Sequence, residues 1–251
     1  MSRARRIRAE SVAAWRSFVR RRTAVFFTFG FPIVLIAIFA GLVRTGGLFG
    51  GRGTHAAAYL AVVVVFTPLS RLASEVVRQR EGRRFEKLAT TPLTPAEWLL
   101  AQTLVTVSVV GLAAIVVLGA LVALGTPVAL SPWLVVYVPV ATSVFCGVGA
   151  VIGSLADGRD GAIAAANAIA LPLILLSETF VPASALPGWF RPAVEMSPVT
   201  YFARGLQAAS DPAAIGWPGS IAASCAVLVI AGSVALVVGT WLLPWARSAP
   251  T

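Results

Sequence analysis

The longest charged stretch between two apolar segments runs from Arg78 to Gln102 and reads RQREGRRFEKLATTPLTPAEWLLAQ. This stretch holds the only lysine, Lys87, and three of the ten acidic residues, and long apolar segments flank it on both sides. Alternating basic and acidic side chains are typical of a solvated surface rather than of a catalytic centre. We interpret the stretch either as a rigid element that a partner protein can push, or as a solvated loop that holds two helices apart.

The other reactive residue types exclude several kinds of site. A nucleotide-binding P-loop needs a lysine in the pattern G-x-x-x-x-G-K-[ST], but Lys87 lies in FEKLA. The two cysteines, Cys146 and Cys225, fall in apolar runs, and the single His55 cannot form a histidine-based metal cluster. No Ser/His/Asp set and no usefully spaced pair of carboxylates is present. We predict that the chain is not an enzyme and holds no metal or cofactor of its own.

Composition indicates an integral membrane protein. Of the 251 residues, 58% are apolar and 12% are charged, whereas soluble domains carry about 25% charged residues. The net charge of +10 comes from arginines next to apolar runs, which indicates membrane topology rather than nucleic-acid binding. A transmembrane helix needs about 20 apolar residues to cross about 30 Å of hydrocarbon. We predict an all-α fold with six transmembrane helices, at 24–43, 55–72, 98–124, 133–155, 162–177 and 221–243.

The first 22 residues carry eight arginines and have the pattern of an amphipathic helix. One helical face holds Ile7, Ala14, Trp15 and Phe18, while Arg3, Arg6, Arg16 and Arg20 lie elsewhere. Such a helix would lie in the membrane interface with its apolar side toward the lipid, or the arginines are simply a positive-inside signal. We predict an interfacial helix over 1–22 and a six-span domain over 23–251.

The distribution of basic residues predicts the orientation in the membrane. With the N-terminus in the cytoplasm, sixteen of the twenty basic residues fall in cytoplasmic segments. This bias is the one that the positive-inside rule describes. We predict a multi-pass protein of the cell membrane with both termini in the cytoplasm.

Local signals predict a helix–turn–helix order inside the charged stretch. Gly82 permits a bend, the segment 83–89 can form a short helix, and the residue before Pro92 disfavours its continuation. Thr94 and Glu97 then form a capping box at the start of the next transmembrane helix. One turn before the stretch, Arg71 and Glu75 are spaced to pair with each other.

The motif R-x-R-E-G…F-E-K-L-x-x-T-P-L-x-x-x-E-W resembles the cytoplasmic loop of the ABC type-2 permease family, and the chain is similar to daunorubicin-resistance-type permeases. In that family the loop is a coupling helix that docks on an ATPase subunit. Where the family often has Gly-Thr before the aromatic residue, this chain has Arg83-Arg84. The resemblance implies a coupling loop over 76–97, with contacts from Arg80, Glu81, Arg83, Arg84, Phe85, Glu86, Lys87, Leu88, Thr91 and Pro92.

A second segment, 171–207, resembles the family's outer region after the fifth span. Its matching residues are Phe180, Pro182, Leu186, Pro187, Trp189, Pro198, Thr200 and Tyr201. The resemblance implies short re-entrant helices over 178–219. The alternative from composition alone is an ordinary amphipathic extracellular loop.

Taken together, the resemblances imply the permease subunit of an ABC exporter that moves an amphipathic, lipid-like or drug-like substrate. ATP and magnesium would be bound by two copies of a separate ABC ATPase subunit. The permease would form a homodimer, or a heterodimer with a similar permease. The alternative is an ATP-independent membrane transporter or a membrane assembly factor.

Two polar residues are candidates for the transport pathway. An acid at the end of a span is a functional candidate, which singles out Glu178, and Asn167 lies within the fifth span. Alternatively, Glu178 lies in headgroup water and Asn167 bonds to a neighbouring helix. The turn DGRDG at 157–161 is either solvated or a second contact with the ATPase.

Overall fold

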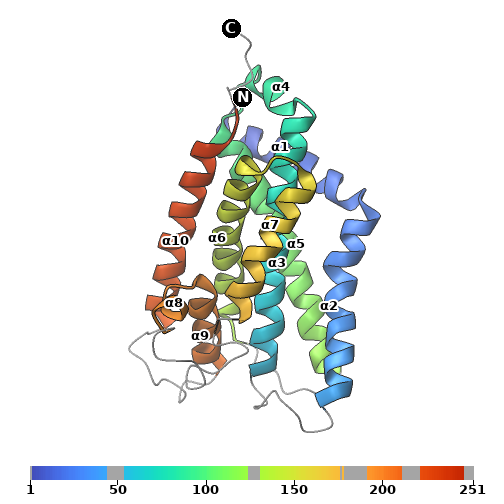
Figure 1. The fold of residues 1–251 in the computed structure, drawn as a ribbon, viewed down its shortest axis with the longest axis vertical. Coiled ribbons are helices and arrows are strands. Elements are labelled where there is room, and N and C mark those ends of the chain that lie inside the picture. The colour runs from blue at the N-terminus through green and yellow to red at the C-terminus, as the bar shows by residue number, and fades with distance from the viewer. Residues whose placement is uncertain are drawn as a thin grey trace.

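The computed structural model describes residues 2–43, 54–123, 131–175, 177, 191–210 and 221–245, and within these ranges the regular structure is helical. Six long helices run up and down one bundle (Figure 1). They are α2 (Arg22–Val43), α3 (Thr54–Glu81), α5 (Pro95–Ala123), α6 (Leu134–Leu155), α7 (Arg159–Leu175) and α10 (Ile221–Leu242). The predicted all-α fold class is confirmed.

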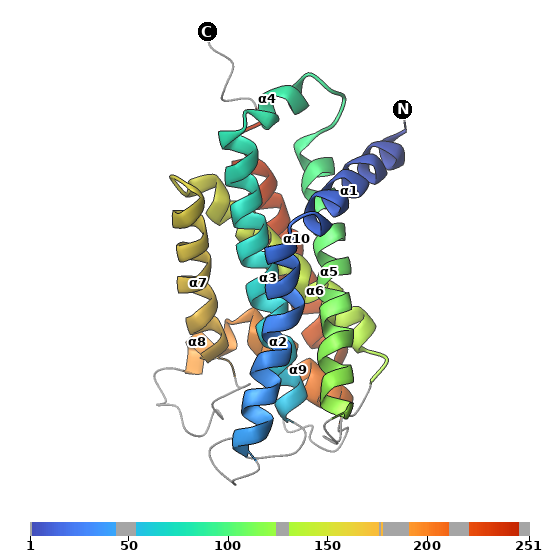
Figure 2. The ribbon, with the colours of Figure 1, turned by 90° about the vertical axis from the view of Figure 1, so that its right-hand side faces the viewer.

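Four shorter helices lie at the two ends of the bundle. The end that we call the α4 end carries α1 (Arg3–Val19) and α4 (Arg84–Ala89), and the last turn of α10 lies there too (Figures 1 and 2). The opposite end, the α8 end, carries α8 (Arg191–Glu195) and α9 (Pro198–Ser210). The basic residues of α1, of the α3–α4 connection and of the α6–α7 turn lie toward the α4 end, whereas Arg191 and Arg204 lie at the other end.

Four of the described helices are long and apolar enough to cross a membrane: Tyr59–Glu81, Pro95–Ala123, Leu134–Leu155 and Ile221–Leu242. Within α2, the part described as an apolar helix is the shorter segment Arg22–Val34, and α7 has 17 residues. The chain is therefore a multi-pass membrane protein. Its second, third, fourth and sixth predicted spans are helices of sufficient length, and the first and fifth stay predictions.

The centre of the bundle is α6, which packs against α3 on one side and α10 on the other. Glycines make both approaches possible, because small residues let helix backbones come close together in membranes. A Cβ atom on Gly153 would lie 2.5 Å from the carbonyl oxygen of Ala73 on α3. A Cβ atom on Gly147 would lie 2.4 Å from the carbonyl carbon of Ala235 on α10. The positions of α3 and α10 thus depend on glycines in α6.

Replacing Gly153 with alanine should destabilise the bundle by about 1–3 kcal/mol, because the new methyl group can be accommodated only by moving α3. The matched control is Gly111→Ala on α5, where a Cβ atom would meet nothing within 4 Å. Thermal unfolding in detergent should show a lower midpoint for Gly153→Ala than for the wild type, and an unchanged midpoint for Gly111→Ala. Equal midpoints for the two variants would contradict the close packing of α6 on α3.

Part of the apolar face expected for 1–22 packs against protein in α1, and the interfacial position of this helix stays a prediction. Ala14 and Phe18 are buried, and they pack with Val105 and Val109 of α5 instead of facing lipid. Trp15, predicted for the same apolar face, is 37% exposed. Two of the four residues on this face, Ala14 and Phe18, are thus covered by protein, because α1 lies across the first turns of α5 (Figure 2).

At the α8 end, α9 packs against α10, α3 and α6. Gly205 of α9 lies against the ring of Tyr137, whose hydroxyl donates a hydrogen bond to the carbonyl oxygen of Ile221. Pro198 is the first residue of α9, where proline is favoured. Residues 178–190 and 211–220 lie outside the described ranges, and with them Glu178, Phe180, Pro182, Leu186, Pro187 and Trp189. The predicted re-entrant structure over 178–219 stays a prediction.

Candidate coupling site at the α4 end

The connection between α3 and α5 has the predicted helix–turn–helix order. After α3 ends at Glu81, α4 covers Arg84–Ala89, and the hydroxyls of Thr90 and Thr91 donate to the carbonyl oxygens of Lys87 and Leu88, at 2.8 and 2.6 Å. The predicted capping box is confirmed. The N–H of Thr94 donates to Glu97 Oε2 (3.1 Å), and the N–H of Glu97 donates to Thr94 Oγ1 (3.3 Å).

The turn that precedes α4 depends on Arg83 rather than on Gly82 alone. Arg83 has a φ of +49° and lies in the left-handed region, which costs a non-glycine residue roughly 1–2 kcal/mol. Arg83 occupies the position where the resembled family often has glycine. The sequence predicted the bend at Gly82, one residue before its observed position, because glycine permits a bend.

Replacing Arg83 with glycine should therefore stabilise α4 by up to about 1 kcal/mol, since glycine adopts a positive φ without steric cost. The matched control is Arg84→Gly, which puts glycine inside α4 and should cost about 1 kcal/mol. Hydrogen exchange of the α4 amides should slow in the first variant and accelerate in the second. Faster exchange in both variants would show that the left-handed turn is not under strain.

One face of α4 is anchored in the protein and the other faces outward. Phe85 is 2% exposed, and its ring lies 5.1 Å from that of Trp98 in an edge-to-face arrangement and 5.5 Å from that of Trp245. Aromatic pairs of this geometry add to the free energy of burial. Six predicted coupling residues are exposed and two, Glu86 and Leu88, are half-buried. The exposed ones are Glu81, Arg83, Arg84, Lys87, Thr91 and Pro92.

Arg80, also predicted to contact a partner, is half-buried and binds within the chain. Its guanidinium donates to the carbonyl oxygens of Ser154 and Ala156, where α6 ends. Cations are favoured at the C-terminus of a helix because the helix dipole is negative there. Arg80 therefore links the end of α3 to the end of α6 through hydrogen bonds.

Behind α4, a buried carboxylate ties α1 to α5. The side chain of Glu97 is 1% exposed, and Arg6 donates to both of its oxygens, from Nε at 3.0 Å and from Nη2 at 2.5 Å. Arg3 lies 3.5 Å from the same carboxylate. The sequence pattern placed Arg3 and Arg6 off the apolar face of α1 but did not predict this pairing, which joins residues 91 positions apart in the sequence. Glu97 thus both caps α5 and binds α1.

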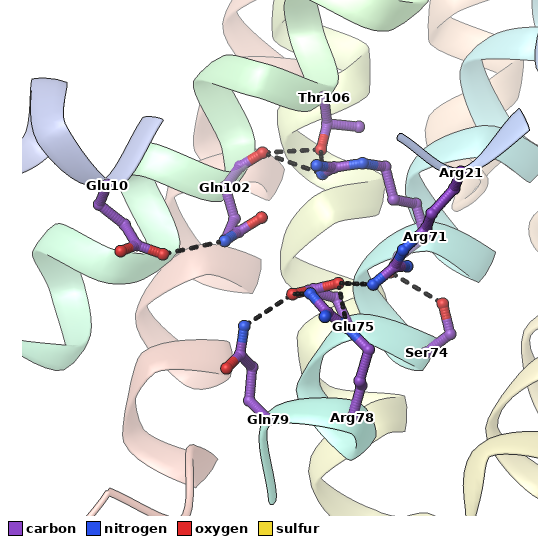
Figure 3. Close-up of polar contacts among 9 residues, drawn as sticks. All are labelled: Glu10, Arg21, Arg71, Ser74, Glu75, Arg78, Gln79, Gln102 and Thr106. Carbon is purple, nitrogen blue, oxygen red and sulfur yellow. Dashed lines mark hydrogen bonds and ion pairs between the residues drawn. The ribbon is translucent and has the colours of Figure 1, made fainter. Parts of the chain in front are cut away.

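A second buried carboxylate, Glu75, ties α3 to the start of α2 (Figure 3). It forms an ion pair with Arg78, lies 3.5 Å from Arg21, and accepts a hydrogen bond from Gln79 Nε2 at 2.7 Å. The predicted partner, Arg71, instead donates to α5. Its Nη1 atom lies 2.5 Å from Thr106 Oγ1 and 3.3 Å from the carbonyl oxygen of Gln102.

Glu10 of α1 completes this polar network. Gln102 donates to Glu10 Oε1 at 3.3 Å (Figure 3), and burial raises the pKa of the Glu10 carboxyl. Sequence reasoning missed Glu10, Arg21 and Gln102 as members of the network. The available signal was that charged residues next to apolar spans need partners of opposite charge. The network joins α1, α2, α3 and α5 directly behind α4.

Of the two candidate pathway residues, Asn167 is not part of this site. Asn167 is half-buried on α7, about two turns from the start of that helix, and α7 packs against α3 through Ala162, Ala166 and Ala170. Glu178 lies outside the described residues. In the described part of the chain, no group of three or more His, Cys, Asp and Glu residues could hold a metal ion.

Comparison with known proteins identifies the family. The family model described as ABC-2 type transporter matches residues 6–209, which include most of α1, all of α4 and all the coupling residues predicted above. No match was found among curated proteins. Because the family model covers most of the chain, this multi-pass membrane protein belongs to the ABC-2 type transporter family.

Proposed function

We propose that this chain is the permease subunit of an ABC exporter, and that a separate ABC ATPase subunit docks on the outward face of α4. The observation that carries the proposal is the two-sided character of α4. Phe85 is buried between two tryptophans, while charged residues of the same short helix point away from the bundle. An element that is rigid on one side and exposed on the other can transmit force.

The packing behind α4 suggests where the force goes. Phe85 contacts Trp98 in the second turn of α5, and Glu97 beside it holds α1 through Arg6. On the other flank, Arg80 connects the end of α3 with α6. A displacement of α4 would therefore move α3 and α5 together with the elements that these bonds attach to them. ATP and magnesium would be bound by the ATPase subunit, of which two copies would serve a permease dimer.

The charge distribution supports a cytoplasmic position for the α4 end. Positive residues are retained on the cytoplasmic side of membrane proteins, and the described basic residues lie mainly toward this end. With α2 and α7 as the first and fifth of six spans, both termini would be cytoplasmic. The region around 178–219 would then form the predicted re-entrant cap on the outer side.

We further propose that two permease chains enclose the pathway between α2, α3 and α7, as a homodimer or with a similar permease. The apolar character of these helices favours an amphipathic, lipid-like or drug-like cargo over a small ion. Asn167 and Glu178 are the polar candidates along this pathway. An ATP-independent transporter or an assembly factor is the alternative, but neither would use an outward-facing charged α4.

The proposal is tested by reversing one charge on the docking face. Glu86→Arg should leave the fold intact, because Glu86 is half-buried and its ion pair with Arg83, at 4.0 Å, is solvent-exposed and weak. It should lower permease-dependent ATP hydrolysis by the partner at least fivefold in reconstituted vesicles. The matched control is Glu195→Arg, the same exchange at an exposed site at the α8 end. Unchanged ATP hydrolysis in Glu86→Arg would remove this residue from the interface.

A further inference from the structure

Three aromatic rings from distant parts of the sequence meet beneath α4. They belong to Phe85 of α4, Trp98 of α5 and Trp245, which lies three residues after the end of α10. The ring centroids of Phe85 and Trp245 are 5.5 Å apart, and those of Trp98 and Trp245 are 6.5 Å apart. With the Phe85–Trp98 pair at 5.1 Å, each ring touches the other two. These separations are those of favourable aromatic pairs.

The segment that carries Trp245 is itself held in place. Leu243 is 7% exposed, and the backbone N–H of Trp245 donates to the carbonyl oxygen of Leu243 at 2.8 Å, which turns the chain toward α4. The surrounding apolar cluster includes Leu72 of α3 and Cys146 of α6. The aromatic rings thus occupy the point where α3, α4, α5, α6 and the end of α10 meet.

A helix of six residues cannot hold its own position. Isolated helices shorter than about 12–15 residues are marginal in water, and Phe85 is the buried residue of α4. The position of α4 therefore depends on the two surfaces that enclose the Phe85 ring. Trp98 provides the surface on the helix that follows α4, and Trp245 provides the surface on the last described segment of the chain.

We propose that Trp245 is a positioning residue, which holds α4 in its docking orientation and links the movement of α4 to α10. Because α10 packs along α6 at Gly147, the coupling element is thereby connected to the centre of the bundle, not only to the two helices that flank it in sequence. This inference rests on the proposed docking role of α4 for its functional consequence, but the positioning of α4 can be measured without any partner.

The first test measures the mobility of α4 in the full-length permease reconstituted in nanodiscs. A spin label is placed at the exposed position 87 by Lys87→Cys, with Cys146 and Cys225 replaced by alanine. Trp245→Ala should increase the mobility of the label, whereas Trp245→Phe should keep the ring contact and restore most of the immobilisation. The control is Trp241→Ala, a tryptophan on α10 that is 88% exposed. Unchanged label mobility in Trp245→Ala would overturn the inference.

The second test separates positioning from general stability and from the proposed function. With the ATPase co-purified, Trp245→Ala should reduce permease-dependent ATP hydrolysis at least fivefold, while Trp245→Phe and Trp241→Ala should stay within twofold of the wild type. Thermal midpoints within a few degrees of each other would show that the bundle is intact.

Should Trp245→Ala unfold, Trp245→Leu takes its place in both tests. A mobile label together with full ATP hydrolysis would overturn the link to coupling. Failure of the wild type to bind any ATPase would overturn the proposed function but not the positioning of α4.

Discussion

Replacing Glu75 with alanine is expected to lower the free energy of unfolding by about 3–5 kcal/mol, the cost of breaking a buried ion pair by removing one partner. The Glu75 side chain is 8% exposed and interacts with Arg78, Arg21 and Gln79. Its loss would leave two arginines and an amide without their acceptor at the junction of α2 and α3. Chemical denaturation in detergent, or the thermal midpoint, would measure the loss.

Two comparisons identify the cause of this destabilisation. Glu75→Gln keeps the side-chain volume and one acceptor oxygen. It should therefore lower the free energy of unfolding by less than Glu75→Ala does, but by more than about 1 kcal/mol. Glu86→Ala removes a glutamate whose pairing with Arg83 is exposed, and exposed pairs contribute about 0–1 kcal/mol. If Glu75→Ala cost no more than Glu86→Ala, the network at the α4 end would not hold the helices together.

Replacing Phe85 with alanine is expected to detach α4 while leaving the long helices folded. Removing a buried phenylalanine typically costs 3–5 kcal/mol, and here that cost falls on a helix of six residues with one buried side chain. The amides of α4 should therefore exchange with solvent at least tenfold faster. The amount of ATPase that co-purifies with the permease should fall by a similar factor, because the docking face loses its fixed position.

The control for this result is Leu88→Ala, which removes a half-buried apolar side chain from the same helix. It should accelerate exchange in α4 by less than threefold. An unaltered exchange rate in Phe85→Ala would mean that other contacts position α4. Faster exchange with undiminished ATPase binding would mean that the partner docks elsewhere.

Local features of this site could be predicted from the sequence because neighbours in the chain determine them. The Thr94–Glu97 capping box involves residues three positions apart, and the end of α4 follows from the threonines before Pro92. The existence of the long apolar helices likewise follows from composition along the chain, although α3 continues nine residues beyond the predicted span 55–72, to Glu81. The left-handed conformation of Arg83 was not predicted, because the preceding residue, Gly82, adopts such a conformation more readily.

Contacts between distant elements could not be predicted, because the sequence does not give the rotation of one helix against another. Arg71 is spaced to pair with Glu75 on its own helix, but it donates hydrogen bonds to Thr106 and to a backbone carbonyl oxygen of α5. Glu75 is instead paired with Arg78 and with Arg21, which directly precedes α2. The Arg6–Glu97 pair and the contact of Trp245 with Phe85 could not be predicted for the same reason, since each joins elements that are distant in the sequence.

The most direct test of the central claim is to purify the tagged permease from its native membrane in mild detergent and identify the proteins that accompany it. We expect a P-loop ATPase in a stoichiometric amount, which is retained in Glu195→Arg and lost or strongly reduced in Phe85→Ala. A homo-oligomer without any ATPase, under conditions in which known transporter complexes stay intact, would contradict the proposed role as an ABC permease subunit. That result would favour an ATP-independent transporter, with Asn167 and Glu178 as the next residues to change.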